Sequence, residues 1–220
     1  MKFESVAIAS FPRSGNTWMR HLLHEAIGIG SRYNLNPETG PAHHAAAIPE
    51  IEDLKAPFVK THTRDANQYQ AAIHLIRHPC SAIASYLDYF EAFDNRVNNR
   101  REFVQVEAEG WAKHSEYWRL ASVCGIPIDY LLVQYEDLVS DTLFILFKVV
   151  KMFLDCHEVP LEQLGKAVKD CSLENLQIKG STKFYPKGGE RKYTDTLQPE
   201  EIKTIMRITE KERFHYPYGP

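Results

Sequence analysis

The chain has 220 residues, of which 44% are hydrophobic and 25% are charged, as in an ordinary globular protein. Its formal net charge of -3 argues against nucleic acid or an anionic membrane surface as a general partner, because both carry negative charge. It shows no secretory signal at its start and no run of the ~20 apolar residues that a membrane helix needs. We therefore expect a cytoplasmic protein in which residues 1–220 form one domain; nothing in the sequence indicates its oligomeric state.

Cysteine and histidine are placed without any metal-binding pattern. The four cysteines, Cys80, Cys124, Cys156 and Cys171, are scattered and form no C-x-x-C pair, which favours small buried side chains over disulfides or metal ligands. The ten histidines contain no H-E-x-x-H motif. The sequence therefore predicts no metal site.

The first predicted elements are a buried strand around residues 5–8 and a helix over residues 19–27, joined by a loop that spans residues 9–18. The first N–H groups of a helix have no intrahelical acceptor and carry partial positive charge, so this arrangement suits an anion. Gly15 permits a close turn, and Arg13 offers a planar guanidinium. Ser14 and Thr17 add hydroxyl donors. An ordinary turn capped by Thr17 is the alternative reading.

The remaining elements alternate between strands and helices. A long connection over residues 28–57 leads to strands at 57–62 and 71–76 and a helix at 81–90. A charged, solvated loop at 94–102 precedes two helices between residues 103 and 124. A further strand at 128–133 is followed by helices at 143–154 and 161–168, a basic segment at 179–196 and a last helix at 199–212.

This alternation predicts an α/β fold with a parallel sheet covered by helices on both faces. Ligands of such sheets bind outside the carboxyl ends of the strands. Four polar segments follow predicted strands and should meet at that edge, namely residues 12–17, 60–62, 77–85 and 135–137.

The first loop is not the usual nucleoside-triphosphate loop. That loop reads G-x-x-x-x-G-K-[ST], whereas this one lacks the leading glycine and has Ser14-Gly15-Asn16-Thr17 in place of Gly-Lys-Ser/Thr. No apolar strand ends in an aspartate suited to magnesium, because Ile76 is followed by Arg77 and Val133 by Gln134. Triphosphate hydrolysis is therefore the weaker hypothesis.

The polar motifs occur in an order that resembles the sulfotransferases that use 3′-phosphoadenylyl sulfate (PAPS). The motifs are Phe11 to Trp18, Lys60-Thr61-His62, Arg77-His78-Pro79 with Ser85, Tyr135-Glu136-Asp137-Leu138 and Lys187-Gly188. The resemblance covers most of the chain. It implies a three-layer α/β/α fold related to P-loop NTPases, no metal, and transfer of a sulfuryl group from PAPS to a hydroxyl or amine, which leaves 3′-phosphoadenosine 5′-phosphate (PAP).

The resemblance also implies which residues bind the donor. The 5′-phosphosulfate loop corresponds to Arg13, Ser14, Gly15, Asn16 and Thr17, with Trp18 near or beneath the adenine. The contacts to the 3′-phosphate correspond to Arg77 and Ser85, and a late segment that closes over it to Lys187 and Gly188. Tyr135 is similar to a tyrosine that contacts adenine, and Ser172 stands where a hydroxyl often contacts the nucleotide.

Three residues are implied in the chemistry. His62 corresponds to the base that receives the proton of the acceptor, which typically speeds such a step by ~10²–10⁴-fold. Lys60 lies two residues earlier and would project from the same face of the strand, where it could neutralise charge on the sulfuryl oxygens. Arg13 replaces a lysine usual in many members and is expected to stabilise the leaving phosphate by its fixed charge.

The sequence departs from the family at Pro186, which stands where an arginine normally binds the 3′-phosphate. Two other functions stay open, a P-loop kinase that uses ATP and a non-catalytic nucleotide-binding module. A small molecule or a glycan is the expected acceptor, and its identity is not readable from the sequence.

Overall fold

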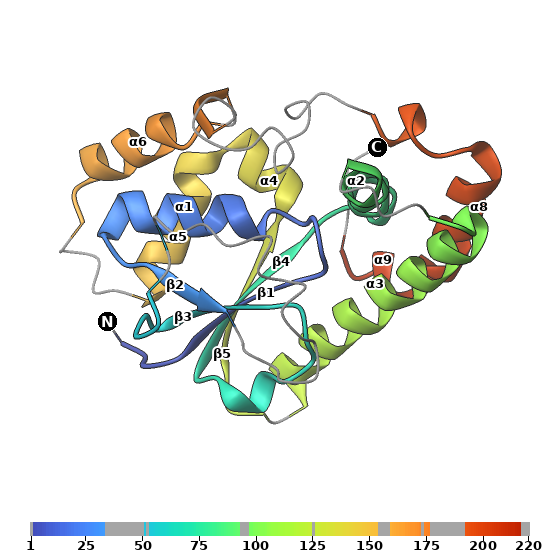
Figure 1. Ribbon diagram of the computed structural model, residues 1–220. Helices are drawn as coiled ribbons and strands as arrows, with labels where there is room; N and C mark the ends of the chain where they lie inside the picture. Colours follow the sequence, from blue (N-terminus) through green and yellow to red (C-terminus); the bar gives the residue numbers. More distant parts are fainter. Residues whose placement is uncertain are drawn as a thin grey trace.

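The fold is built on one sheet of five parallel strands, drawn in Figure 1. The computed structural model describes residues 2–33, 51, 53–92, 97–124, 126–153, 159–172, 174–176 and 192–216. The strands lie in the order β2-β3-β1-β4-β5. Their bounds are β1 Val6–Ser10, β2 Ser31–Tyr33, β3 Phe58–Thr61, β4 Ala71–Ile76 and β5 Asp129–Gln134. All residues of β1, β3 and β4 are buried, as expected for central strands of a sheet covered on both faces.

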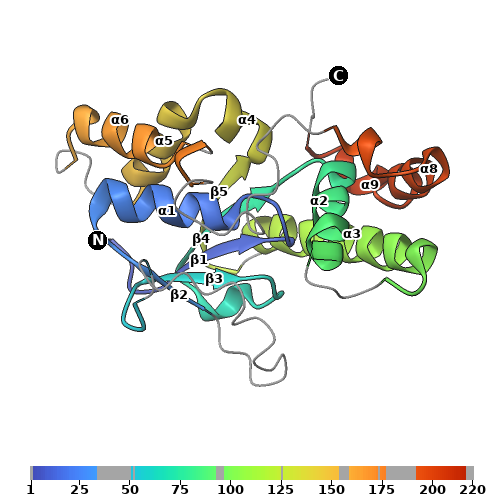
Figure 2. The ribbon, with the colours of Figure 1, turned by 45° about the horizontal axis from the view of Figure 1, so that its top comes forward.

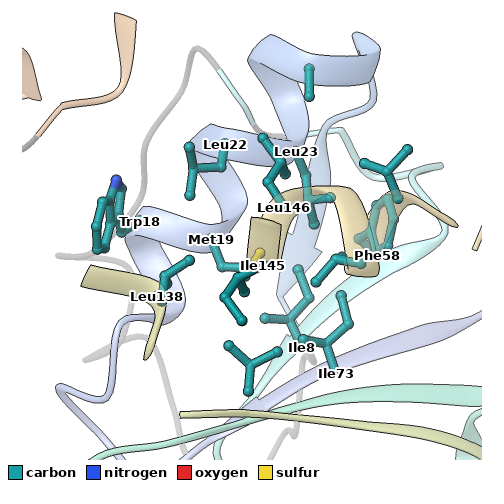
Figure 3. Close-up of a cluster of buried hydrophobic side chains, with 14 of the residues drawn as sticks. Ile8, Trp18, Met19, Leu22, Leu23, Phe58, Ile73, Leu138, Ile145 and Leu146 are labelled. Atoms are coloured by element: carbon teal, nitrogen blue, oxygen red, sulfur yellow. The ribbon is translucent and has the colours of Figure 1, made fainter. Parts of the chain in front are cut away.

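One face of the sheet is covered by α1 (Asn16–Ile27) and α5 (Thr142–Phe153), with α4 (Tyr135–Ser140) and α6 (Leu161–Asp170) beside them. The apolar residues of α1 recur at positions 19, 22, 23 and 26, which lie on one side of a helix. Figure 3 shows how Met19, Leu22 and Leu23 meet Ile145 and Leu146 of α5 above Ile8 and Ile73 of the sheet. This core holds the start of α1 above the end of β1.

The opposite face is covered by α3 (Arg100–Val123), against which α2 (Pro79–Ala92), α8 (Pro199–Ile208) and α9 (Glu210–Arg213) pack. Trp118 and Ala121 of α3 lie on Ala7, Ala9 and Ala72 of the sheet, where alanines leave room for the indole. Figure 2 shows α2, α8 and α9 gathered beside α3 and away from α5 and α6. Two short 3-10 turns, η3 (Ala66–Gln68) and η4 (Tyr193–Asp195), complete the described elements. The predicted three-layer α/β fold is confirmed.

The prediction of two helices between residues 103 and 124 is wrong, because α3 is one helix of 24 residues. Its buried residues Val104, Ala108, Trp111, Ser115 and Trp118 recur every three or four positions, so one continuous stripe faces the core. The helix also begins inside the segment expected as a loop. Asn99 caps it, since its side chain accepts a hydrogen bond from the Glu102 N–H at 3.2 Å.

The last helix and the long connection also differ from expectation. The helix predicted over residues 199–212 divides at Thr209, where φ of -92° and ψ of 0° depart from helical values and the hydroxyl donates to the Ile205 carbonyl at 2.8 Å. The connection expected over residues 28–57 begins with strand β2, which pairs with β3 through Ser31 and Phe58. Cys80 and Cys171 are buried as expected, whereas Cys124 is exposed, and all three are free thiols. Within the described ranges, no helix is long and apolar enough to cross a membrane.

Candidate functional site

The loop between β1 and α1 adopts left-handed backbone at two positions. Arg13 has φ of 67° and Gly15 has φ of 95°. Gly15 is the N-cap of α1 and no side chain caps the helix, so the first intrahelical bond runs from the Met19 N–H to the Gly15 carbonyl. The first turn contains no acidic residue. The start of α1 therefore presents the positive end of the helix dipole without a neutralising carboxylate.

Gly15 is required for space as well as for its conformation. A Cβ atom at this position would lie 2.7 Å from Cδ2 of Tyr135, the first residue of α4. The Tyr135 ring also packs edge-on against Trp18, with ring centroids 6.1 Å apart. The predicted adenine-contacting tyrosine thus lies directly against the loop.

His62 follows β3 and lies beside the end of β1. Its Nδ1 atom is 2.6 Å from the carbonyl oxygen of Ser10 and 3.4 Å from the Ser10 hydroxyl. A carbonyl oxygen only accepts hydrogen bonds, so Nδ1 must carry the proton. In the neutral imidazole this leaves Nε2 as the basic nitrogen.

Lys60 lies in β3, two residues before His62, which follows the strand. Lys60 and Phe58 are two residues apart on the strand, so their side chains point to the same face of the sheet. The Phe58 side chain packs in the core beneath α1, and Lys60 therefore lies on the face that α1 covers. Lys60 is buried, at 9% exposed. A lysine ammonium so placed adds positive charge on the same face as the start of α1.

The Arg13 side chain runs toward α2. Its Nε atom donates to the Ser85 hydroxyl at 3.2 Å, and its Cζ atom lies 5.1 Å from the centroid of the Tyr89 ring. Ser85 and Tyr89 are four residues apart on α2 and so share one side of that helix. The contact of Tyr89 with Arg13 was not predicted, although the i, i+4 relation of Tyr89 to Ser85 could have indicated it.

Arg77 follows β4 and supports the loop from its other side. Its Nη1 atom donates to the Arg13 carbonyl at 3.1 Å, and its Cζ atom lies 4.3 Å from the centroid of the Tyr135 ring. The Arg77 carbonyl accepts from the Trp111 indole N–H at 3.0 Å. Arg77 Nε is buried and has no hydrogen-bond partner among the described residues.

The residues after Arg77 are fixed by a second contact with α4. The Glu136 carboxylate accepts a hydrogen bond from the His78 N–H at 3.0 Å. Burial raises the pKa of Glu136. The pKa of His78 is lowered to about 4, mainly by burial and further by the charges of Arg213 and Arg77. His78 stacks on Tyr193, with ring centroids 5.4 Å apart.

Several predicted donor-binding residues have buried side chains. Asn16 donates to the Ile8 carbonyl at 2.7 Å and to the Ser10 hydroxyl at 3.1 Å, and Trp18 donates to the Cys171 carbonyl at 2.8 Å. Ser14 is fully buried, and its hydroxyl has no hydrogen-bond partner within the described ranges. The Ser172 hydroxyl accepts from the Asn175 N–H at 3.2 Å. Thr17 is half-buried and remains partly accessible to solvent.

The predicted convergence of the four polar segments is therefore observed, through contacts between Ser10 and His62, Arg13 and Ser85, and Arg77 and Tyr135. Lys187 and Gly188 lie outside the described residues, as does Pro186. The Ser10 carbonyl was not predicted, because a backbone acceptor leaves no trace in a side-chain motif. Among the residues that the structure describes, no group of three His, Cys, Asp or Glu side chains could hold a metal ion.

Comparison with solved structures shows the same fold. The chain matches a mouse sulfotransferase, SULT7A1, crystallised with PAP, at a TM-score of 0.74 and 15% identity, covering 97% of this chain and 84% of that one. It matches a retinol dehydratase in complex with androsterone and PAP at a TM-score of 0.66 and 15% identity, covering 99% and 82% of the two chains. A sulfotransferase domain of the Synechococcus olefin synthase matches at 0.51 and 16% identity, covering 98% and 95%.

Sequence comparison identifies curated relatives and a family. A WSCD family member of Drosophila melanogaster is 28% identical over 173 residues, which cover 71% of this chain and 51% of the relative. A second, of Drosophila pseudoobscura pseudoobscura, is 30% identical over 152 residues, covering 62% and 46%. The chain thus spans about half the length of the curated relatives that it matches. The sulfotransferase domain model matches residues 3–215, and the chain therefore belongs to the sulfotransferase domain family.

Proposed function

We propose that this chain transfers a sulfuryl group from PAPS to a hydroxyl or amine of an acceptor, with His62 as the general base. One observation carries the proposal. The 2.6 Å contact between His62 Nδ1 and the Ser10 carbonyl fixes the proton on Nδ1, so Nε2 is the atom able to take a proton from the acceptor. The same contact holds the ring at the carboxyl end of β1, beside the loop that begins there.

The residues around the loop fit an anionic nucleotide. The start of α1 lacks a capping side chain and an acidic residue, and Gly15 allows a close approach of its backbone. The Ser14 hydroxyl and Arg77 Nε are buried donors without partners in the described part of the chain, and phosphate or sulfate oxygens would accept from such groups. When bound, PAPS would supply the sulfuryl group and a phosphate that leaves with PAP.

The protein's own residues would contribute charge and proton transfer. His62 would accept the acceptor proton at Nε2 while Nδ1 keeps its hydrogen bond to Ser10. Lys60, on the α1 face of β3, would hold a positive charge near the start of α1, where negative charge must be neutralised. A sulfuryl group carries less charge than a phosphoryl group, so fixed cations suffice in this proposal and the transfer is expected to need no metal.

The acceptor in this proposal is a small molecule or a glycan. The retinol dehydratase that shares the fold was crystallised with androsterone, which supports a small hydroxyl-bearing acceptor. Glycan acceptors stay within the proposal.

Two measurements test this function. Thermal unfolding should shift upward with PAP and not with ATP plus magnesium, because a ligand that binds only the folded state stabilises it. Stabilisation by ATP plus magnesium alone would instead identify a kinase-like protein. Transfer of labelled sulfate from PAPS should then be measured on a panel of phenols, steroids and oligosaccharides.

The base is tested with a matched pair of variants. His62→Asn places an amide N–H near the position of Nδ1 but has no basic nitrogen, so transfer should fall by ~10²–10⁴-fold while PAP binding is kept. His215→Ala removes an exposed histidine outside the site and should leave transfer unchanged. Full transfer by His62→Asn would refute the role of His62, and a wild type that binds PAP but transfers to no acceptor would indicate a binding module.

A further inference from the structure

Glu107 of α3 is a half-buried carboxylate that the proposed mechanism does not use. Burial raises the pKa of Glu107, and no hydrogen bond or cation among the described residues contributes to that shift. Glu109, two residues later, is instead paired with Lys113 at 3.4 Å on the outer side of the helix. Because a negative charge is unfavourable where water is partly excluded, Glu107 is a group that a cationic ligand would stabilise.

The helix places no side chain in the space one turn after Glu107. Gly110 stands there and is partly accessible to solvent. A Cβ atom on Gly110 would lie 3.5 Å from Cε2 of Phe11 and 3.9 Å from Oε2 of Glu107, which are ordinary van der Waals distances. Packing against the described residues therefore does not require glycine, although glycine weakens a helix relative to alanine. The space that Gly110 leaves borders both the Glu107 carboxylate and the Phe11 ring.

This space adjoins the candidate site. Phe11 directly follows Ser10, whose carbonyl oxygen lies 2.6 Å from His62 Nδ1. The Phe11 ring packs edge-on against Tyr86 of α2, with ring centroids 6.1 Å apart. The pKa of Tyr86 is raised to about 12, mainly by burial and further by the charge of Glu107, so the carboxylate lies close to that ring. Figure 2 shows α2 and α3 side by side at this end of the molecule.

The rings beside the carboxylate suit a cation with an apolar body. The centroid of the Tyr86 ring lies 4.9 Å from that of Phe90 and 5.9 Å from that of Phe103, and all three residues are half-buried. The faces of aromatic rings attract cations. The same cluster already holds one, since Cζ of Arg13 lies 5.1 Å from the centroid of the Tyr89 ring.

We propose that Glu107 selects the acceptor by binding a protonated amine, which the acceptor carries in addition to the hydroxyl that is sulfated. This inference rests on the proposed function and narrows the acceptor to a cationic hydroxyl compound. The ammonium group would donate to the Glu107 carboxylate beside Gly110, and the apolar body would lie on the rings of α2 and α3. A neutral sugar is less favoured, because its hydroxyls supply no counter-charge. Glu107 takes no part in moving the proton or the sulfuryl group.

The experiment compares two phenols of similar size, tyramine and p-ethylphenol, of which only tyramine carries an ammonium group. Their dissociation constants are measured by calorimetry on the protein saturated with PAP, and their sulfation by PAPS is measured in parallel. The wild type should bind tyramine roughly 10- to 100-fold more tightly than p-ethylphenol, the range expected for a hydrogen bond to a charged group.

Three variants locate the preference, with Tm and the PAP dissociation constant recorded for each. Glu107→Gln keeps the shape and removes the charge, so the preference for tyramine should disappear while binding of p-ethylphenol and PAP changes by less than about threefold. Glu109→Gln, which removes a carboxylate paired on the outer side of the same helix, should keep the preference. Gly110→Ala should weaken tyramine at an equal or higher Tm, because alanine fills the space and favours the helix.

The failures of the inference and of the proposed function are distinguishable. Equal affinity of the wild type for the two phenols, or an unchanged preference in Glu107→Gln, would overturn the inference. Binding of a neutral oligosaccharide that Glu107→Gln abolishes would overturn it as well and assign the carboxylate to sugar hydroxyls. A wild type that does not bind PAP would contradict the proposed function instead. Should Glu107→Gln fold poorly, Gly110→Ala provides the second comparison.

Discussion

The side-chain amide of Asn16 donates a 2.7 Å hydrogen bond to the carbonyl of Ile8, so the first residue of α1 is tied to the middle of β1. Because Asn16 is buried, Asn16→Ala should lower the free energy of unfolding by about 1–3 kcal/mol. Thr17→Ala, at the adjacent half-buried position, should change stability much less. Urea denaturation of both variants checks this, and equal stability losses would show that the Asn16 contact adds nothing particular.

Alanine substitutions at three glycines distinguish the stability cost of backbone strain from the cost of steric crowding. Gly15 and Gly28 both have positive φ, at 95° and 66°, but only Gly15 has a side chain in the way, that of Tyr135. Gly28→Ala should cost ~1–2 kcal/mol for its conformation alone, and Gly15→Ala should cost more. Gly165→Ala, inside α6 with no atom within 4 Å, should stabilise by roughly 0.5–1 kcal/mol. Equal losses at Gly15 and Gly28 would mean that the Tyr135 ring moves aside without cost.

Buried histidines should make the fold sensitive to acid. Burial lowers the pKa of His74 to about 3 and lowers that of His114 well below 6.5. The unfolded chain therefore binds more protons below pH 6.5, so stability is full above that pH and falls as the pH drops toward 3.

Each histidine changes the free energy of unfolding by at most ~1.4 kcal/mol per pH unit. The raised pKa of Glu107 acts in the opposite direction, which is why variants are needed to isolate the histidines. Denaturant titrations between pH 7.5 and pH 5 should show that the free energy of unfolding depends less on pH in the double variant His74→Phe, His114→Phe than in the wild type. An identical slope in the two proteins would contradict the prediction.

Two ion pairs join α3 to α9, and they differ in how far their carboxylates are buried. Arg119 donates to Glu212 through Nε at 3.0 Å and Nη2 at 3.1 Å, and the Glu212 side chain is 3% exposed. Arg119→Met would leave that carboxylate buried and unpaired, which should cost about 3–5 kcal/mol. Lys211→Met, which removes the exposed pair with Glu116, should have little effect. Similar losses in thermal or urea unfolding would show that burial does not distinguish the pairs.

The sequence predicts the strands that are long and apolar and misses the one that is not. Strands β1, β3, β4 and β5 follow from runs such as 71–76, whereas β2 consists of Ser-Arg-Tyr at the sheet edge and carries no such run. The division at Thr209 was not predicted either, because helical spacing does not reveal a local change of backbone angles.

For the site, the sequence indicates which residues meet but not how their side chains pair. Parallel topology alone brings His62, Arg77 and Tyr135 to one edge. The contact of Arg13 with Ser85 was not predicted, and Arg13 has a left-handed backbone, a conformation that a non-glycine residue seldom adopts.

The Tyr135 ring lies against three groups at once, the Gly15 backbone, the Trp18 indole and the Arg77 guanidinium. The ring therefore contacts residues that follow β1 and a residue that follows β4. A substitution at Tyr135 should therefore alter the surroundings of the β1–α1 loop and of Arg77 together.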